Sequence, residues 1–245
     1  DLRRALTLSL DHQAYIDIIT GGQGDIGGVM QPPPSGLWGM PREMLTKLPG
    51  YDPDVQKSRA AARKIMEKLG YGPDKRFSVT VSTRNVAGYR DPAVILIDQL
   101  KEIYIDAVLD AIDTTQWYPI LARKDYKIGV NVTETAVDDP DPAFYENYVC
   151  GAQRNYTGYC NLAVDKLVDR QSAEPDVEKR KRLVWEIERK LAEDDARPIL
   201  FYPRAAYCWQ PQVKGLTIMA NSIYNGNRYE DLWLEQGIGT SAPKR

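Results

Sequence analysis

The chain has 245 residues, of which 43% are hydrophobic and 27% are charged, and its formal net charge is −2. This composition fits a folded globular protein and excludes disordered and collagen-like chains. Acidic and basic residues are interspersed, so no basic stripe indicates nucleic-acid binding, and no apolar run approaches the roughly 20 residues that cross a bilayer. The sequence opens on an amphipathic helix with neither Met nor signal peptide before it, so we expect a fragment of a longer protein.

Helical and strand patterns alternate along the first part of the chain. We predict a helix from Leu2 to Ile19, an irregular segment through Pro32–Pro34, a helix from Pro53 to Leu69 and a strand from Phe77 to Ser82. Asp52 is the expected N-cap of the second helix and Gly70 its expected stop.

The same alternation continues downstream. We predict a helix opening at Asp91-Pro92, a strand over 107–112, a short helix capped by Thr114 or Thr115, a strand over 126–132, helices beginning at Asn161 and Asp176, and strands over 198–202 and 205–209. The strand, helix and strand order indicates parallel pairing, and thus an α/β fold. The helices that begin at Asn161 and Asp176 should pack as an antiparallel pair.

Sequence motifs for catalysis and cofactor binding are missing, so we expect neither an enzyme nor a cofactor. There is no nucleophile elbow, phosphate loop or dinucleotide fingerprint. His12 is the single histidine, expected to be solvated or capping. The run Asp138, Asp139 and Asp141 leaves a carboxylate-dependent hydrolase or a calcium loop open, although repeated Asp-Pro pairs favour turns and helix starts.

Three cysteines fit neither a disulfide scaffold nor a zinc site. Cys150 and Cys160 would be able to pair in an oxidising compartment. The alternative is that they are small buried residues, as is expected of Cys208.

Polar and aromatic residues after the strands are the candidates for a binding site. Open α/β sheets bind ligands beyond the carboxyl ends of their strands, and tyrosine and tryptophan offer both a stacking face and a polar edge. The candidate ligand-binding residues are Trp38, Arg84, Asn85, Asn131, Thr133, Glu134, Asp138 and Tyr145. We expect Arg84 to pair with an anionic group and Trp38 or Tyr145 to stack on a ring.

Several short motifs occur in a characteristic order. They are Leu2-Arg3-Arg4-Ala5-Leu6 with Asp11, Tyr51-Asp52-Pro53, Gly70-Tyr71, Asp139-Pro140-Asp141, Asn155-Tyr156-Thr157-Gly158-Tyr159, Asp165-Lys166-Leu167, and Arg180 before Trp185. In these motifs the chain resembles the C-terminal half of the family 5 extracellular solute-binding proteins of ABC importers.

The resemblance implies one lobe of a type II periplasmic binding protein, a mixed sheet flanked by helices, that closes on an N-terminal lobe around a solute. Residues 1–215 would form the ligand-binding lobe, and residues 216–245 a segment returning toward the N-terminal lobe and a mobile tail. The protein would be periplasmic and would deliver its solute to a membrane permease. A sensor or interaction module derived from such a lobe is the alternative without transport.

One departure from the family bears on the solute. The resemblance implies that peptide binders carry a Trp and an amine-binding Asp where this chain has Thr133 and Ala136. Losing that carboxylate removes a charge-assisted hydrogen bond from a peptide amine. A sugar-like or opine-like solute is therefore expected, and a single histidine argues against nickel.

Overall fold

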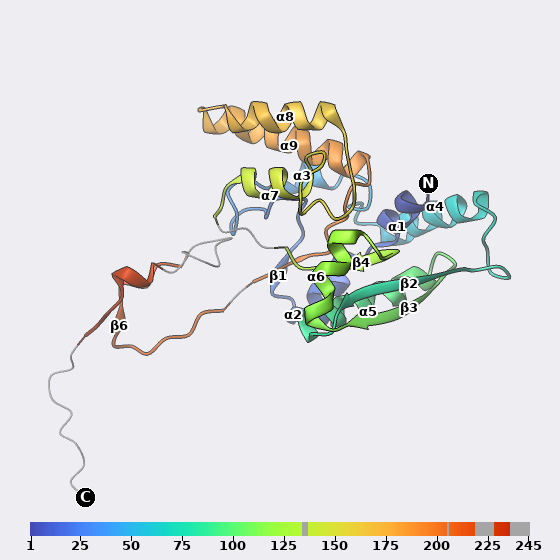
Figure 1. Ribbon diagram of the computed structural model, residues 1–245, viewed down its shortest axis with the longest axis horizontal. Helices are drawn as coiled ribbons and strands as arrows, with labels where there is room; N and C mark the ends of the chain where they lie inside the picture. Colours follow the sequence, from blue (N-terminus) through green and yellow to red (C-terminus); the bar gives the residue numbers. More distant parts are fainter. Residues whose placement is uncertain (134–136, 205, 219–227, 236–245) are drawn as a thin grey trace, which may run out of the picture.

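The computed structural model describes residues 1–133, 137–204, 206–218 and 228–235. Helices lie above a small sheet with its own helices, and the C-terminal residues extend away from both (Figure 1). We call residues 1–25, 52–133 and 198–203 the sheet half, and residues 26–51 and 137–197 the helical half.

A parallel sheet forms the centre of the sheet half. Its strands β2 (Phe77–Arg84), β3 (Ile105–Ile112) and β4 (Ile128–Val130) are ordered β3-β2-β4. Helix α5 (Ala87–Lys101) connects β2 to β3, and α6 (Thr114–Arg123) connects β3 to β4. The predicted α/β fold with parallel pairing is confirmed, and all carboxyl ends of this sheet lie at one edge.

The single helix predicted over 2–19 is wrong, because the chain forms α1 (Leu2–Ser9) and α2 (His12–Thr20). Leu10 is extended, with φ −70° and ψ 129°. Asp11 then caps α2, since its side chain accepts a hydrogen bond from the Ala14 N–H at 3.1 Å. An internal cap thus ends one helix and begins the next.

Three other predicted helix starts were displaced by a nearby residue. Asp54, not Asp52, caps α4 (Val55–Lys68) by accepting from the Lys57 N–H at 2.9 Å. Asp113, not a threonine, caps α6. Helix α5 begins before Pro92, which lies in its second turn. A proline there removes one backbone hydrogen bond without ending the helix.

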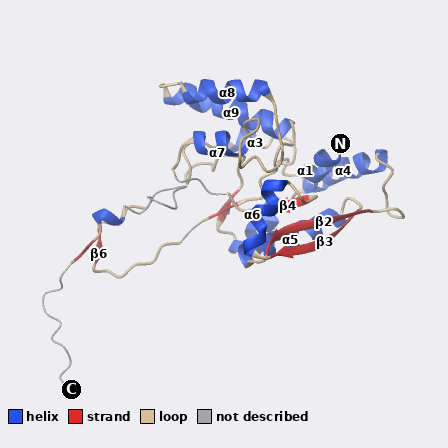
Figure 2. Ribbon diagram, in the orientation of Figure 1, coloured by secondary structure: helices blue, strands red, loops and turns tan. Residues whose placement is uncertain are grey.

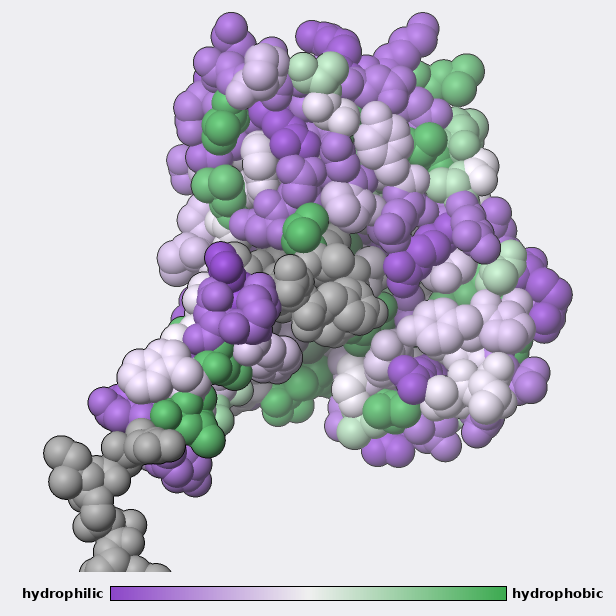
Figure 3. All heavy atoms as spheres, turned by 60° about the vertical axis from the view of Figure 1, so that its left-hand side comes forward, coloured by the Kyte–Doolittle hydropathy of each residue, from purple (hydrophilic) through white to green (hydrophobic). Residues whose placement is uncertain are grey.

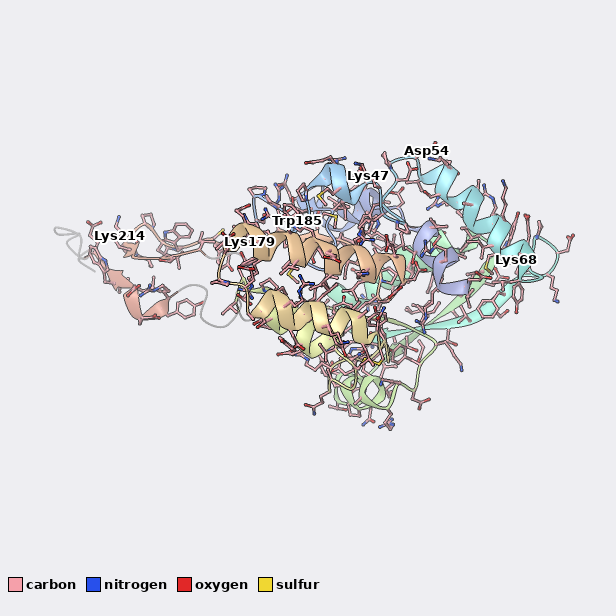
Figure 4. All side chains as sticks on the ribbon, turned by 90° about the horizontal axis from the view of Figure 1, so that it is seen from above. Lys47, Asp54, Lys68, Lys179, Trp185 and Lys214 are labelled. Atoms are coloured by element: carbon pink, nitrogen blue, oxygen red, sulfur yellow. A yellow bond between two sulfur atoms is a disulfide. The ribbon has the colours of Figure 1, made fainter. Side chains whose placement is uncertain are left out.

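The helical half contains α3 (Arg42–Leu45), α7 (Pro140–Asn147), α8 (Leu162–Ser172) and α9 (Val177–Glu193). Helices α8 and α9 lie side by side as the predicted antiparallel pair (Figure 4). Their predicted caps are confirmed: Asn161 accepts from the Ala163 N–H at 3.0 Å, and Asp176 from the Lys179 N–H at 2.9 Å.

Each half has its own apolar core. Residues from Ala5 to Tyr15 and from Ala62 to Val130 form the core of the sheet half, together with Leu200 and Phe201. Residues from Met30 to Leu48 and from Ala143 to Ala196 form the cores of the helical half. The chain therefore enters and leaves each half more than once.

The C-terminal strands are shorter than predicted. Of the range 198–202, only Tyr202 is in a strand, β5 (Tyr202–Pro203), which pairs antiparallel with β1 (Gly24–Asp25). Residues 206–209 are not in a strand, and Ala205 lies outside the described residues. Strands β6 (Val213–Lys214) and β7 (Trp233–Leu234) form a separate antiparallel pair next to the short helix η1 (Tyr229–Asp231) (Figure 2). Lys214 lies well apart from the helices (Figure 4).

Candidate functional site

The carboxyl ends of β2 and β4 lie side by side, since the Thr83 hydroxyl donates to the Val130 carbonyl at 2.9 Å. Arg84 and Asn131 therefore lie at the same edge of the sheet. The Arg84 Nε donates to the Thr114 hydroxyl at 2.9 Å, and its guanidinium is 5.3 Å from the centroid of the Tyr89 ring. Asn131 accepts a hydrogen bond from the Trp117 Nε1 at 3.0 Å.

Asn85 is the exposed residue that follows β2. Its backbone N–H donates to the Ile112 carbonyl at 2.8 Å. Its side chain thus lies at the same edge as Arg84.

Trp38 and Asp138 connect the irregular segment of the helical half to the start of α7. The Trp38 Nε1 donates to the Asp138 carbonyl at 2.8 Å, and the Leu37 N–H donates to the Asp138 carboxylate at 3.1 Å. The Trp38 side chain is only 5% exposed. The expected stacking of this ring on a solute is therefore corrected, because packing in the core holds it away from solvent.

Arg180 forms a charge-paired cluster with the acidic run. Its guanidinium donates to both carboxylate oxygens of Asp139 at 2.8 Å and to Asp141 at 3.2 Å. It also lies 4.8 Å from the centroid of the Trp38 ring, while Gln171 and Ser172 donate to Asp141. Asp139 additionally caps α7. These two carboxylates are thus engaged in structural contacts rather than arranged as a catalytic pair.

Arg197 lies where the two halves meet, and its contacts are neutral. Its guanidinium donates to the Asn147 side-chain oxygen at 3.2 Å and to the Thr133 hydroxyl. It lies 5.9 Å from the centroid of the buried Tyr148 ring. Burial raises the pKa of Tyr148 and of Tyr126, and the positive charge of Arg197 opposes both rises.

Glu188 is a buried carboxyl group in α9. Its Oε1 accepts a hydrogen bond from the Met30 N–H at 2.9 Å, and its Oε2 has no hydrogen-bond partner among the described residues. Burial raises the pKa of Glu188 to about 8, although backbone N–H groups, foremost that of Met30, oppose the rise. Gly28 allows the close approach, because a Cβ atom there would lie 2.5 Å from the Glu188 Oε1.

His12 is not solvated or capping as expected, because it is 7% exposed and joins three segments. Its Nδ1 lies 2.7 Å from the Leu200 carbonyl and its Nε2 3.1 Å from the Gly50 carbonyl. The ring stacks on Tyr51 with centroids 4.7 Å apart. Burial lowers the pKa of His12, against the opposing effect of the two carbonyl contacts. Beside it is a hollow between the halves, also lined by Asp195 and Arg197.

The remaining candidates fall elsewhere. The half-exposed Tyr145 donates its hydroxyl to Asp169 at 2.8 Å, so it is directed toward α8. Cys150 and Cys160 form a disulfide in the connection between α7 and α8, and Cys208 is a free, exposed thiol. Glu134 and Ala136 lie outside the described residues.

Sequence reasoning missed Arg197, Glu188 and the burial of His12 as features of this region. No three His, Cys, Asp or Glu side chains gather as a metal-binding group in the part of the chain that the structure describes. The described helices all fall short of the length and apolar content needed to cross a membrane. Most of the surface of the helical half that Figure 3 displays is hydrophilic.

Comparisons with known proteins agree with this architecture. Residues 1–155 match the family model of bacterial extracellular solute-binding proteins, family 5 Middle. The probable D,D-dipeptide-binding periplasmic protein DdpA of Escherichia coli is 25% identical over 235 residues, which cover 93% of this chain and 43% of DdpA. The oligopeptide-binding protein AppA of Bacillus subtilis is 24% identical over 210 residues, which cover 82% of this chain and 38% of AppA.

The fold is also similar to solved structures. OppA of Burkholderia pseudomallei matches with a TM-score of 0.77 and 20% identity, covering 96% of this chain and 45% of OppA. The similar structures are of the type II periplasmic binding protein fold, which confirms the expected fold class. The chain thus spans about four-tenths of the length of the curated relatives that it matches.

Proposed function

The chain belongs to the family 5 bacterial extracellular solute-binding proteins, and we propose that it supplies one lobe of a two-lobed protein that captures a small polar solute for an ABC importer. The observation that carries this proposal is the family match, in a chain that has the fold of such proteins over nearly its whole length. The polar side chains at the carboxyl edge of the sheet support it, since open α/β sheets bind ligands there.

We assign residues 1–215 to the ligand-binding lobe and residues 216–245 to a segment that returns to an N-terminal lobe and ends in a tail. Large apolar side chains are exposed on the described part of that segment. They are Ile218, Tyr229, Trp233 and Leu234. Exposed apolar residues gathered in a short segment favour contact with another surface.

The solute would close the two lobes by hinge motion, and a membrane permease would then receive it. The family is one of extracellular proteins, and the finer assignment that we propose is the periplasm. No cofactor enters this function.

The relatives are named for dipeptide and oligopeptide binding, and this chain differs from peptide binders at Thr133 and Ala136. We therefore propose a solute whose capture does not depend on a free amino group, such as an opine-like or sugar-like compound. Arg84, Asn85, Asn131 and Thr133 are the described residues that we assign to its binding, with Asp138 and Tyr145 near the rim and Glu134 between them in sequence.

A thermal-shift screen of the intact protein against peptides, opines, oligosaccharides, amino acids and metal salts tests this function. A ligand at about 100 times its Kd should add about 2.7 kcal/mol to the free energy of unfolding. Opines or sugars should raise the melting temperature while peptides do not, and Arg84→Ala with Asn131→Ala should abolish that shift. Silence of the whole panel would contradict the binding function, and an unchanged shift in the double variant would contradict the site.

A further inference from the structure

Arg197 differs from the other well-ordered arginines near it in having no carboxylate partner. Most of the arginines that make side-chain contacts in the described residues pair with an acid. These pairs are Arg4 with Asp195, Arg76 with Asp106, Arg154 with Glu146, Arg180 with Asp139, Arg189 with Glu193 and Arg204 with Asp25. None of the ion pairs found among the described residues includes Arg197, whose partners are an amide oxygen, a hydroxyl and an aromatic ring.

The guanidinium of Arg197 therefore keeps hydrogen-bonding capacity. An arginine has five N–H donors in a planar fork. One donor on each terminal nitrogen is used, toward Asn147 and Thr133, and the described residues provide no acceptor for the others. The face of the Tyr148 ring fixes the plane of the fork without neutralising its charge.

The nearest buried acids do not neutralise Arg197. Asp195 is paired with Arg4, whose Nε lies 2.7 Å from its Oδ2. Glu188, with its pKa raised to about 8, is mostly protonated at neutral pH. The positive charge of Arg197 thus remains uncompensated by any described group, in a position half withdrawn from solvent.

The position of Arg197 is adjacent to the proposed binding region. Thr133 ends the described part of the loop that follows β4, at the edge of the sheet that carries Arg84 and Asn131. Arg197 contacts that loop directly through the Thr133 hydroxyl. It also lines the hollow between the sheet half and the helical half.

We propose that Arg197 binds a carboxylate group of the solute, so that the protein selects solutes with a free carboxylate over neutral sugars. This inference rests on the proposed function and names the chemical class of its solute. The planar fork of arginine matches the two oxygens of a carboxylate, which gives it both orientation and charge selectivity. Ala136, in place of an acid, removes a charge that would otherwise oppose an anionic solute at this loop.

The test measures Kd by calorimetry on the intact protein, with probes matched in shape. N-acetyl-Ala-Ala is compared with its C-terminal amide, alongside octopine, sucrose and inorganic phosphate. We expect N-acetyl-Ala-Ala or octopine to bind, and removal of the carboxylate charge to weaken binding about 10- to 100-fold. Arg197→Gln should abolish this preference, and Arg197→Lys should restore part of it, because lysine keeps the charge without the fork.

Three outcomes would overturn the carboxylate site. They are sucrose binding without any carboxylated probe, an Arg197→Gln variant that keeps the preference, and phosphate binding more tightly than the carboxylated probes. Glu134→Gln tests the acid outside the described residues. If that change tightens carboxylate binding tenfold or more, Glu134 already occupies Arg197 and the proposal fails. Sucrose binding alone leaves the solute-binding function standing, whereas silence of every probe counts against both.

Discussion

Arg180 and Arg197 both lie in the helical half, and each guanidinium faces an aromatic ring, yet their electrostatic surroundings are opposite. Arg180 lies 4.8 Å from the centroid of Trp38 and donates to two carboxylates. Arg197 lies 5.9 Å from the centroid of Tyr148 and donates only to neutral oxygens. The same side chain is thus a structural connector where its charge is matched, and a candidate for ligand binding where its charge is unmatched.

The energetic consequence follows from what each arginine would leave behind. Removing Arg180 would leave two partly buried carboxylates without a counter-charge, which costs more than the lost contact itself. Removing Arg197 would leave only an amide oxygen and a hydroxyl. The first substitution should therefore act on stability and the second on binding.

The largest expected effect is that of Arg180→Gln. The Arg180 side chain is 15% exposed, and its partners Asp139 and Asp141 are 33% and 35% exposed. We expect a loss of about 2 to 3 kcal/mol in the free energy of unfolding, measured by urea denaturation at pH 7. Arg189→Gln is the matched control in the same helix, because its pair with Glu193 is exposed and should contribute no more than about 0.5 kcal/mol. Equal losses in both variants would break the comparison.

An intermediate effect is expected from Glu188→Gln, an acid without a cation and so the counterpart of Arg197. The pKa of Glu188 is raised from 4.5 to about 8 in the folded protein, so the native state holds the proton more tightly than the unfolded chain. Glu188 therefore favours folding most below pH 4.5, and this contribution is lost as pH rises toward 8, by up to about 1.4 kcal/mol per pH unit.

Urea denaturation across pH 4.5 to 9 measures this difference. The wild type should lose stability relative to Glu188→Gln as pH rises, because glutamine keeps the acceptor for the Met30 N–H and does not ionise. Titration of His12 is common to both proteins and cancels in the comparison. Parallel pH profiles would show that the carboxyl group at position 188 is not held in its neutral form.

The smallest expected effect is that of Arg197→Gln on stability. The substitution removes two hydrogen bonds to neutral acceptors and one ring contact, each worth about 1 kcal/mol or less. Loss of the uncompensated charge offsets part of this, so we expect a change within about 1 kcal/mol in urea denaturation without ligand. A loss as large as that of Arg180→Gln would make Arg197 a structural residue and remove the distinction between the two sites.

Local signals allowed the parallel strands and the α8–α9 pair to be predicted, since periodicity and the caps Asn161 and Asp176 act over a few residues. Helix starts were missed where capping residues compete within a few positions, as Asp54 does with Asp52. The carboxyl edge with Arg84 and Asn131 was also accessible, because it depends only on where strands end.

Arg197 was not accessible from the sequence. Its partners Asn147 and Thr133 are separated from it by 50 and 64 residues. Its significance depends on the lack of a nearby acid, which only tertiary structure defines. The burial of Trp38 has a similar cause, because its partners Asp138 and Trp185 lie 100 and 147 residues away.

The alternation of the chain between the two cores has a consequence for dividing the molecule. The sheet core includes Ala5 as well as Phe201, and the helical cores include Met30 as well as Ala196. A backbone cleavage anywhere between residues 31 and 190 would leave pieces of both cores on each side. Neither half is therefore encoded by one continuous stretch of gene, and a functional split of this protein would require two fragments that fold around each other.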